Sequence, residues 1–353
     1  MKKVSACIIC RNEENNIQAC LESIKGHVDE IVVVDTGSTD NTPEIAKKYA
    51  DVFAVYTECN DSDGKIADFS KARNYSVSLA SHDWIWWHDA DDIVINPENI
   101  RKIVEKYESY PVVQIMFPYE YSQDANGLVD CLHYRERLVY PKSKFSWTSP
   151  VHEVFLSNEN PYTDTSTEVK VSHQHKVAKS RDPLRNFRII KKFVDEIGER
   201  DARQLYYLGL EYGNIGCHND AVRILNRYVE LSGWDDERVL ALLRVCDHYI
   251  TMAWDNYNYD EFFDLAIKTV FKAASIKESW FEVWYALGKC YLNYAKKCES
   301  KNREAHALWE KAVHYFKIAL DCPETKTMLF VSTADRLFNI HTHYNMSLMR
   351  IGR

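Results

Sequence analysis

Two carboxylates stand one residue apart at the end of an apolar run in the first third of the chain. Residues 81–95 read Ser-His-Asp-Trp-Ile-Trp-Trp-His-Asp-Ala-Asp-Asp-Ile-Val-Ile, and the apolar stretch ends on Asp89-Ala90-Asp91. Divalent cations such as Mg²⁺ and Mn²⁺ prefer carboxylate oxygens, and a cation held by one or two carboxylates keeps open positions for phosphate oxygens. The triplet therefore indicates a site for a metal and a diphosphate. Solvated carboxylates in a turn would explain the same residues without a metal.

The elements before the triplet alternate between strand and helix. Residues 4–10 are typical of a buried strand, and the polar turn of residues 11–14 leads into an amphipathic helix. A second apolar strand, residues 30–35, ends on Asp35, and residues 36–40 supply a tight turn and helix caps. This order builds a parallel α/β sheet, which binds ligands at the carboxyl ends of its strands. Asp35 lies at such an end.

Five motifs in the first 180 residues resemble, in this order, those of family 2 glycosyltransferases. They are Cys10-Arg-Asn-Glu-Glu14, Val33-Val-Asp-Thr-Gly-Ser-Thr-Asp40, Asp68-Phe-Ser-Lys-Ala-Arg-Asn74, Trp87-His-Asp-Ala-Asp-Asp92 and Val151-His-Glu153. The resemblance implies the nucleotide-sugar-binding fold called GT-A, a Rossmann-like α/β domain with a mostly parallel sheet. We expect this domain to span residues 1–180.

The resemblance also implies which residues contact the nucleotide sugar. These are Cys10, Arg11, Glu13, Asp35, Asp68, Arg73, Asp89 and Ala90. We expect Asp35 to accept a hydrogen bond from the base, since a carboxylate suits the imide N–H of uracil. A simple strand-end cap is the alternative. Arg73 is expected to reach the nucleotide, because a guanidinium fork suits a base carbonyl or phosphate oxygens. A surface ion pair with Asp68 is the alternative.

The same resemblance implies metal ligands, whereas the candidate catalytic base rests on its position and on chemistry. Asp89 matches a position that meets the ribose or the metal, Asp91 matches the principal metal ligand, and Asp92 replaces the Glu more often found there. A neutral imidazole at His152 is the candidate third ligand, with a structural role as the alternative. Inverting transfer needs a carboxylate that takes the acceptor's proton. Glu153 is predicted to be that base from its position beside His152, with a surface acid as the alternative.

Four further polar residues have less specific roles. Arg135 and Arg137 alternate on a strand and would either help neutralise the diphosphate or form a solvated edge. His173 and His175 have a spacing that allows metal binding, but we expect them to shape the acceptor entrance or cap a strand.

Beyond residue 181, apolar residues at helical spacing replace the strand-like runs. Small and large residues recur in the register of a tetratricopeptide repeat (TPR), a two-helix unit of about 34 residues. The positions of one copy are Leu205, Leu208, Gly209, Tyr212, Ala221, Leu225 and Tyr228, and those of a split copy are Trp284, Leu287, Gly288, Tyr291, Ala312, Phe316 and Ala319. We expect an all-α, TPR-like domain over residues 181–353. Its concave face would hold a peptide, a partner or a second copy of the chain, or the domain would only stabilise or dimerise the protein.

Composition agrees with two domains and argues against nucleic acid and anionic lipid as general partners. A chain of 353 residues is longer than one core usually serves. The net charge of −8 disfavours non-specific electrostatic binding to nucleic acid or to anionic lipid. Scattered cysteines, no apolar N-terminal segment and no run of membrane-spanning length predict a cytoplasmic protein.

The sequence thus predicts a metal-dependent, inverting glycosyltransferase. It would use Mn²⁺ or Mg²⁺ to move a hexose from a UDP-sugar, UDP-glucose first, to a peptide, protein or glycan. Similar enzymes with an appended helical module include transferases of the sublancin type, which glycosylate peptide cysteines. The alternatives are an inactive GT-A scaffold that binds partners through its repeats, and transfer to a lipid-linked glycan or modified DNA. A homodimer through the repeat domain is compatible with each of these.

Overall fold

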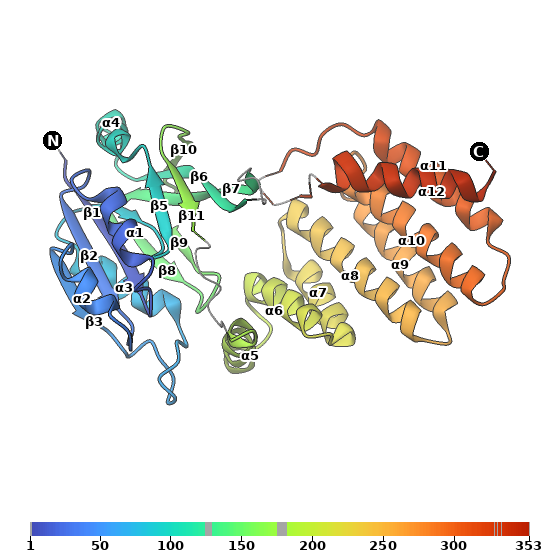
Figure 1. Cartoon of the computed structure of the whole chain (residues 1–353), viewed down its shortest axis with the longest axis horizontal. Helices are drawn as coiled ribbons and strands as arrows, with labels where there is room; N and C mark the ends of the chain where they lie inside the picture. Colours follow the sequence, from blue (N-terminus) through green and yellow to red (C-terminus); the bar gives the residue numbers. More distant parts are fainter. Residues whose placement is uncertain are drawn as a thin grey trace. The chain divides into compact units, whose positions relative to one another are not determined.

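The chain separates into two compact units, Met1–Arg185 and Asn186–Arg353. The computed structural model describes residues 2–327 apart from 124–128 and 175–181, residues 329, 331 and 332, and residues 334–352 (Figure 1). The boundary that the sequence suggested, between residues 180 and 181, lies outside the described residues.

The first unit is an α/β domain. Its strands are β1 (Val4–Cys10), β2 (Glu30–Asp35), β3 (Val52–Val55), β4 (Trp84–Trp87), β5 (Asp92–Ile95), β6 (Val113–Gln123), β7 (Val129–Tyr140), β8 (Phe145–Thr148), β9 (Val154–Ser157), β10 (Tyr162–Thr165) and β11 (Lys170–His173). Its helices are α1 (Ile17–Ile24), α2 (Thr42–Ala46), α3 (Phe69–Leu79) and α4 (Ile100–Tyr107), with short 3₁₀ turns η1 (Pro97–Asn99) and η2 (Lys142–Lys144).

The main sheet has the strand order β3-β2-β1-β4-β7-β6-β11-β5, and β10 pairs with β6 beside this path. Strands β3, β2, β1 and β4 run parallel to one another. Strand β7 is antiparallel to both β4 and β6, and β11 is parallel to β6 but antiparallel to β5. Strands β8 and β9 form a separate antiparallel pair. Most pairs in the main sheet are parallel, so the predicted fold class of this unit is confirmed.

Both faces of the sheet are covered, which explains why β1 and β2 are buried along their whole length. Side chains alternate between the faces of a strand. On β4, Trp84 and Trp86 therefore join the core beneath α1 and α4, whereas Ile85 and Trp87 join the core beneath α3 and the β8–β9 pair. The chain leaves these strands at one edge, where Cys10 of β1 pairs with Asp35 of β2.

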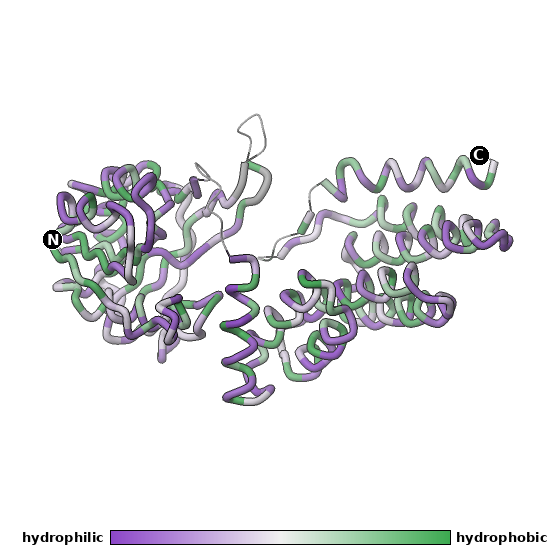
Figure 2. The backbone as a smooth tube through the Cα atoms, turned by 60° about the horizontal axis from the view of Figure 1, so that its bottom comes forward, coloured by the Kyte–Doolittle hydropathy of each residue, from purple (hydrophilic) through white to green (hydrophobic). Residues whose placement is uncertain are grey.

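In the described residues of the second unit all regular secondary structure is helical, as predicted. Its helices are α5 (Arg185–Ile197, which begins on the last residue of the first unit), α6 (Ala202–Asn214), α7 (His218–Leu231), α8 (Asp235–Asp255), α9 (Tyr259–Ala274), α10 (Phe281–Ser300), α11 (His306–Asp321) and α12 (Ile340–Arg350), with a π-helical turn η3 (Asp335–Asn339). Successive helices pack against each other from α6 to α12. Figure 2 shows hydrophobic and hydrophilic residues alternating along these helices, as expected where one side of each helix is buried.

Two small residues explain how closely the paired helices approach. A Cβ atom on Gly209 of α6 would lie 2.6 Å from Cγ of Leu225 on α7, and one on Gly288 of α10 would overlap the ring of Phe316 on α11. The small-against-large register of the sequence is therefore present in both pairs. Among the helices described, none combines the length and apolar content needed to cross a bilayer.

Candidate functional site

A cavity of about 350 Å³ opens at the carboxyl edge of the parallel strands. It is lined by Ile9, Cys10, Arg11, Glu13, Thr36, Ile66, Phe69, Arg73, Asp89, Ala90, Asp91, Tyr119, Tyr121, His173 and Arg185. Six of the eight residues expected to contact the donor are in this set; Asp35 and Asp68 are not. Of the expected metal ligands Asp89 and Asp91 line the cavity, whereas His152 does not, nor does Glu153.

Arg73 is a buried cation in the wall of this cavity. It lies on α3, and its guanidinium carbon is 4.8 Å from the ring centres of both Trp87 and Trp147. Its Nη2 is 2.5 Å from Oδ1 of Asp89, and its Nε is 2.6 Å from Oε1 of Glu153. Burial works against the charge, but these two carboxylates raise the pKa of Arg73 above its usual value. Arg73 thus holds two acids from distant parts of the chain in fixed positions.

Asp68 and Asp35 have local roles in the structure. Asp68 caps α3, because its Oδ1 accepts a hydrogen bond from the Lys71 amide at 3.1 Å. Asp35 is buried, and its Oδ1 accepts hydrogen bonds of 2.8 Å from the amides of Gly37 and Ser38. These bonds match the strand-end cap that was the alternative for Asp35. Contact of either carboxylate with a nucleotide stays a prediction.

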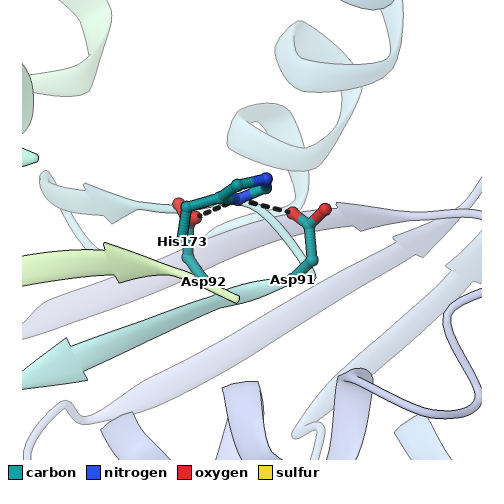
Figure 3. Close-up of side chains that lie close together, drawn as sticks. All are labelled: Asp91, Asp92 and His173. Atoms are coloured by element: carbon teal, nitrogen blue, oxygen red, sulfur yellow. Dashed lines mark hydrogen bonds and ion pairs between the residues drawn. The ribbon is translucent and has the colours of Figure 1, made fainter. Parts of the chain in front are cut away.

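His173 joins the acidic triplet from a distant strand. Strand β11 runs antiparallel to β5 in a register that places His173 opposite Asp92. Nδ1 of His173 lies 3.1 Å from Oδ1 of Asp92 and 3.6 Å from Oδ1 of Asp91. Figure 3 shows the imidazole reaching across the space between these two carboxylates. Among the described residues, Asp91, Asp92 and His173 form a group whose ligand atoms lie within 4.8 Å of one another.

Asp91 is surrounded by more negative than positive charge. Burial, followed by the negative charges of Asp89 and Asp92, raises the pKa of Asp91 to about 6, against a partial opposing effect of His173. Burial also works against protonation of His173, but its hydrogen bond to Asp92 and the charge of Asp91 raise its pKa. Asp91 and His173 both line the cavity, so a cation there would meet a carboxylate, which suits hard divalent cations, and an imidazole, which suits transition metals. The donor set fits a divalent metal.

Asp92 is buried next to the cavity-lining residues Asp91 and His173 and accepts several hydrogen bonds. Its side chain is fully buried; Oδ1 accepts a hydrogen bond from the Tyr119 hydroxyl at 3.0 Å, and Oδ2 accepts one from the Asp89 amide at 3.1 Å. Nη2 of Arg137 is 3.3 Å from the same Oδ2. A carboxylate held in this way fixes the orientation of the imidazole that it contacts, here His173.

Arg137 lies between aromatic rings beneath the cavity. Its guanidinium carbon is 4.0 Å from the ring centre of Trp87 and 4.5 Å from that of Tyr119. Burial alone would raise the pKa of Asp89, but Arg73 and Arg137 outweigh burial and hold that pKa well below its usual value. Only 1% of Arg137 is exposed, and it does not line the cavity, so it belongs neither to a solvated edge nor to the cavity wall.

The loop between β8 and β9 holds the remaining predicted residues. Glu153 is largely buried by its pairing with Arg73. His152 is half-buried and has a φ of 51°, in the left-handed region that residues other than glycine rarely adopt. Their predicted roles as base and metal ligand stay predictions. His175 lies outside the described residues.

Comparison with known proteins finds one family match and several relatives, each of which covers only part of the chain. Residues 5–158 match the family described as Glycosyl transferase family 2. The chain is 43% identical over 95 residues to the TPR repeat-containing protein Synpcc7942_0270 of Synechococcus elongatus, which covers 27% of this chain and 22% of that protein. It is 34% identical over 119 residues to the glycosyltransferase SunS of Bacillus phage SPbeta, covering 33% of this chain and 27% of SunS. The matches therefore span about a quarter of each relative's length.

Solved structures resemble the chain at low identity. S. aureus TarS 1-349 in complex with UDP-GlcNAc is 14% identical, with a TM-score of 0.37, over 86% of this chain and 93% of that one. MamA 41-end from Desulfovibrio magneticus RS-1 is 16% identical, with a TM-score of 0.34, over 48% of this chain and 75% of that one.

Proposed function

We propose that this chain, whose residues 5–158 form a family 2 glycosyltransferase domain, transfers a sugar from a nucleotide sugar to an acceptor and depends on a divalent cation. The observation that supports this most directly is the convergence of Arg73, Asp89 and Asp91 on one cavity at the carboxyl edge of the sheet. Parallel α/β sheets bind their ligands at this edge.

The donor that we propose is a UDP-sugar, with UDP-glucose as the first choice. The cavity of about 350 Å³ lies within the usual size of small-molecule sites. Arg11 and Arg73 bring cationic groups to its wall, and guanidinium groups pair well with phosphate oxygens. We favour uracil because Asp35 lies at the strand end that the family motif associates with the base. Oδ2 of Asp35 is 3.7 Å from Sγ of Cys10, which lines the cavity.

The residues that we propose to hold the cation are Asp91 and His173, with Asp89 beside them. This choice rests on the cavity wall, which includes these three residues but not the sequence-derived candidate His152. Asp92 keeps the His173 ring in place through its hydrogen bond, and Arg137 holds the Asp92 carboxylate in position by pairing with it. A bound Mn²⁺ or Mg²⁺ would stabilise the negative charge that develops on the departing diphosphate.

Glu153 is our candidate for the base that takes the proton from an acceptor hydroxyl or thiol during inverting transfer. Arg73 holds Glu153 with one nitrogen and Asp89 with another, so a single side chain ties the proposed base to the donor side of the site. In this proposal Arg73 sets the spacing between the two groups, as efficient proton transfer requires a carboxylate within hydrogen-bond reach of the acceptor. The acceptor class that we propose is a peptide or protein, or a glycan.

Calorimetric titration of UDP, with and without Mn²⁺, tests this proposal. We expect Mn²⁺-dependent binding that Asp91→Asn weakens at least about tenfold, or about 1.4 kcal/mol. Asp63→Asn is the matched control, because Asp63 is exposed and does not line the cavity. UDP binding that ignores both the metal and the Asp91 substitution would contradict the metal assignment, and no UDP binding by the folded chain would contradict the donor assignment.

A further inference from the structure

The helical unit contains a second cavity, of about 400 Å³, lined by residues of α6, α8 and α10 among others. Glu237, Leu240, Arg244 and Asp247 line it from α8. Residues three or four positions apart lie on the same side of a helix, so these four follow one side of α8. Because an α-helix rises about 1.5 Å per residue, the cavity extends about 15 Å along α8. We call it the α8 cavity.

Glu237 brings a buried carboxylate to the first end of the α8 cavity. Only 6% of Glu237 is exposed. Its Oε2 accepts a hydrogen bond of 2.6 Å from the Tyr228 hydroxyl, whereas its Oε1 has no hydrogen-bond or ion-pair partner among the described residues. Burial raises the pKa of Glu237, and the Tyr228 hydroxyl and the charge of Arg203 offset this only in part. A ligand that donates to Oε1 would therefore satisfy a buried acceptor that is costly to leave unmatched.

Aromatic rings lie around this carboxylate. Tyr206 and Tyr207 of α6 line the α8 cavity, and their ring centres are 5.5 Å apart with the planes at 76°. The ring centre of Tyr206 is also 5.2 Å from that of Tyr228. Burial and then the charge of Glu237 raise the pKa of Tyr206, so the two side chains lie close together. Tyrosine faces beside a carboxylate suit an organic ammonium ion, which is attracted by both.

Acids outnumber cations in the wall of the α8 cavity. Among the described residues its carboxylates are Glu237, Asp247, Glu282 and Asp335, and its cationic groups are Arg244 and Lys289. Leu240 and Leu243 add aliphatic surface between the Glu237 end and the Asp247 end. Burial opposes the charge of Lys289, but the charges of Asp247 and Asp335 raise its pKa, so both acids lie near the second end. A ligand that balances this wall carries positive charge at its ends and methylene groups between them.

We propose that the α8 cavity binds an aliphatic diamine or polyamine. One ammonium group lies between Oε1 of Glu237 and the rings of Tyr206 and Tyr207. The methylene chain lies along Leu240 and Leu243, and a second ammonium group reaches the acids at the other end. This inference does not depend on sugar transfer.

Calorimetric titration of spermidine into the full chain, at physiological ionic strength, tests the proposal. Glu237→Gln keeps the shape of the side chain and an oxygen that can accept the Tyr228 hydrogen bond, but it removes the charge. We expect binding at one site that Glu237→Gln weakens at least about tenfold, because a charge-assisted hydrogen bond becomes a neutral one. Asp235→Asn is the matched control: Asp235 lies two residues earlier on α8, is exposed and does not line the cavity, so affinity should be unchanged.

A change of ligand separates charge from shape. Octanediol has an aliphatic chain with neutral ends and should not bind, and putrescine, a shorter diamine, should bind more weakly than spermidine. Tyr206→Leu should weaken spermidine binding about threefold because an aromatic face is lost, whereas Tyr206→Phe keeps that face and should bind like the original chain.

Four results would overturn the proposal. They are equal affinity of Glu237→Gln and the original chain, an equal loss in Asp235→Asn, binding of octanediol as tight as that of spermidine, and no binding of spermidine by the folded original chain. An equal loss in Asp235→Asn would reveal only a general attraction of polyamines to an acidic protein.

Circular dichroism establishes that each variant keeps its helices. If Glu237→Gln unfolds, Asp335→Asn replaces it, since Asp335 lines the cavity from outside α8. A loss of about threefold is then expected, and no loss overturns the proposal. The titration contains neither donor nor metal, so its failure is distinct from a failure of the proposed transferase activity.

Discussion

Asp91→Asn should make the metal-free protein more stable at neutral pH. Folding raises the pKa of Asp91 from its usual 3.8 to about 6, because burial and the charges of Asp89 and Asp92 penalise the ionised form. Each pKa unit corresponds to about 1.4 kcal/mol, so ionised Asp91 costs about 3 kcal/mol at pH 7.5. Its side chain is 13% exposed, which leaves little screening by water. Asparagine has nearly the same shape and removes this cost.

The size of the stabilisation depends on pH. A carboxyl group whose pKa is raised by folding imposes no cost below pH 3.8, an increasing cost up to about pH 6, and the full cost above it. The gain from Asp91→Asn should therefore fall from about 3 kcal/mol at pH 7.5 to about 1 kcal/mol at pH 4.5.

Urea unfolding in EDTA, followed by tryptophan fluorescence at both pH values, measures this difference. Saturating Mn²⁺ should stabilise the original chain and leave Asp91→Asn almost unchanged, since the cation binds the carboxylate that the variant lacks. Asp63→Asn serves as the control because Asp63 is exposed. An Asp91→Asn variant that is equally or less stable than the original chain at pH 7.5 without metal would refute this expectation. Favourable contacts of the ionised Asp91 carboxylate would then offset the cost of its burial and of the neighbouring negative charges.

Three other substitutions give separate tests. His173→Gln should lower Mn²⁺ affinity at least about tenfold, measured by electron paramagnetic resonance, while His152→Gln changes it less; the reverse order would restore the sequence-derived ligand. Arg73→Lys should lower the free energy of unfolding in urea by about 1–3 kcal/mol, because lysine keeps the charge but cannot pair with Asp89 and Glu153 through a planar guanidinium group. An unchanged free energy of unfolding would show that this double pairing is dispensable. Gly288→Ala should cost about 1–3 kcal/mol, because its Cβ would overlap Phe316, whereas Gly233→Ala, with no atom within 4 Å of the added carbon, should be nearly neutral in thermal melts.

The sequence was sufficient to predict the elements whose signal is local. The apolar runs of residues 4–10 and 30–35 are strands because helices cover both faces of the sheet, and both runs end at the edge where the cavity opens. The small residues at Gly209 and Gly288 mark helix pairs because a side chain there would strike the neighbouring helix.

The parts of the site that depend on long-range register could not be predicted. His173 reaches Asp92 only because β11 pairs antiparallel with β5, a strand about eighty residues earlier in the chain. The alternation of Arg135 and Arg137 was visible, but not that aromatic rings of β4 and β6 would bury Arg137 beside Asp92. Arg73 was expected beside the nucleotide or Asp68, and its pairing with Glu153, eighty residues away, carries no local signal.

Release of UDP from UDP-glucose, UDP-galactose and UDP-N-acetylglucosamine, with GDP-mannose as a control for the base, tests most directly whether the chain is a metal-dependent sugar transferase. We expect slow, Mn²⁺-dependent hydrolysis of one UDP-sugar, lost in Asp91→Asn and kept in Asp63→Asn. A folded chain that neither binds nor hydrolyses any donor would contradict this expectation and would favour a binding scaffold.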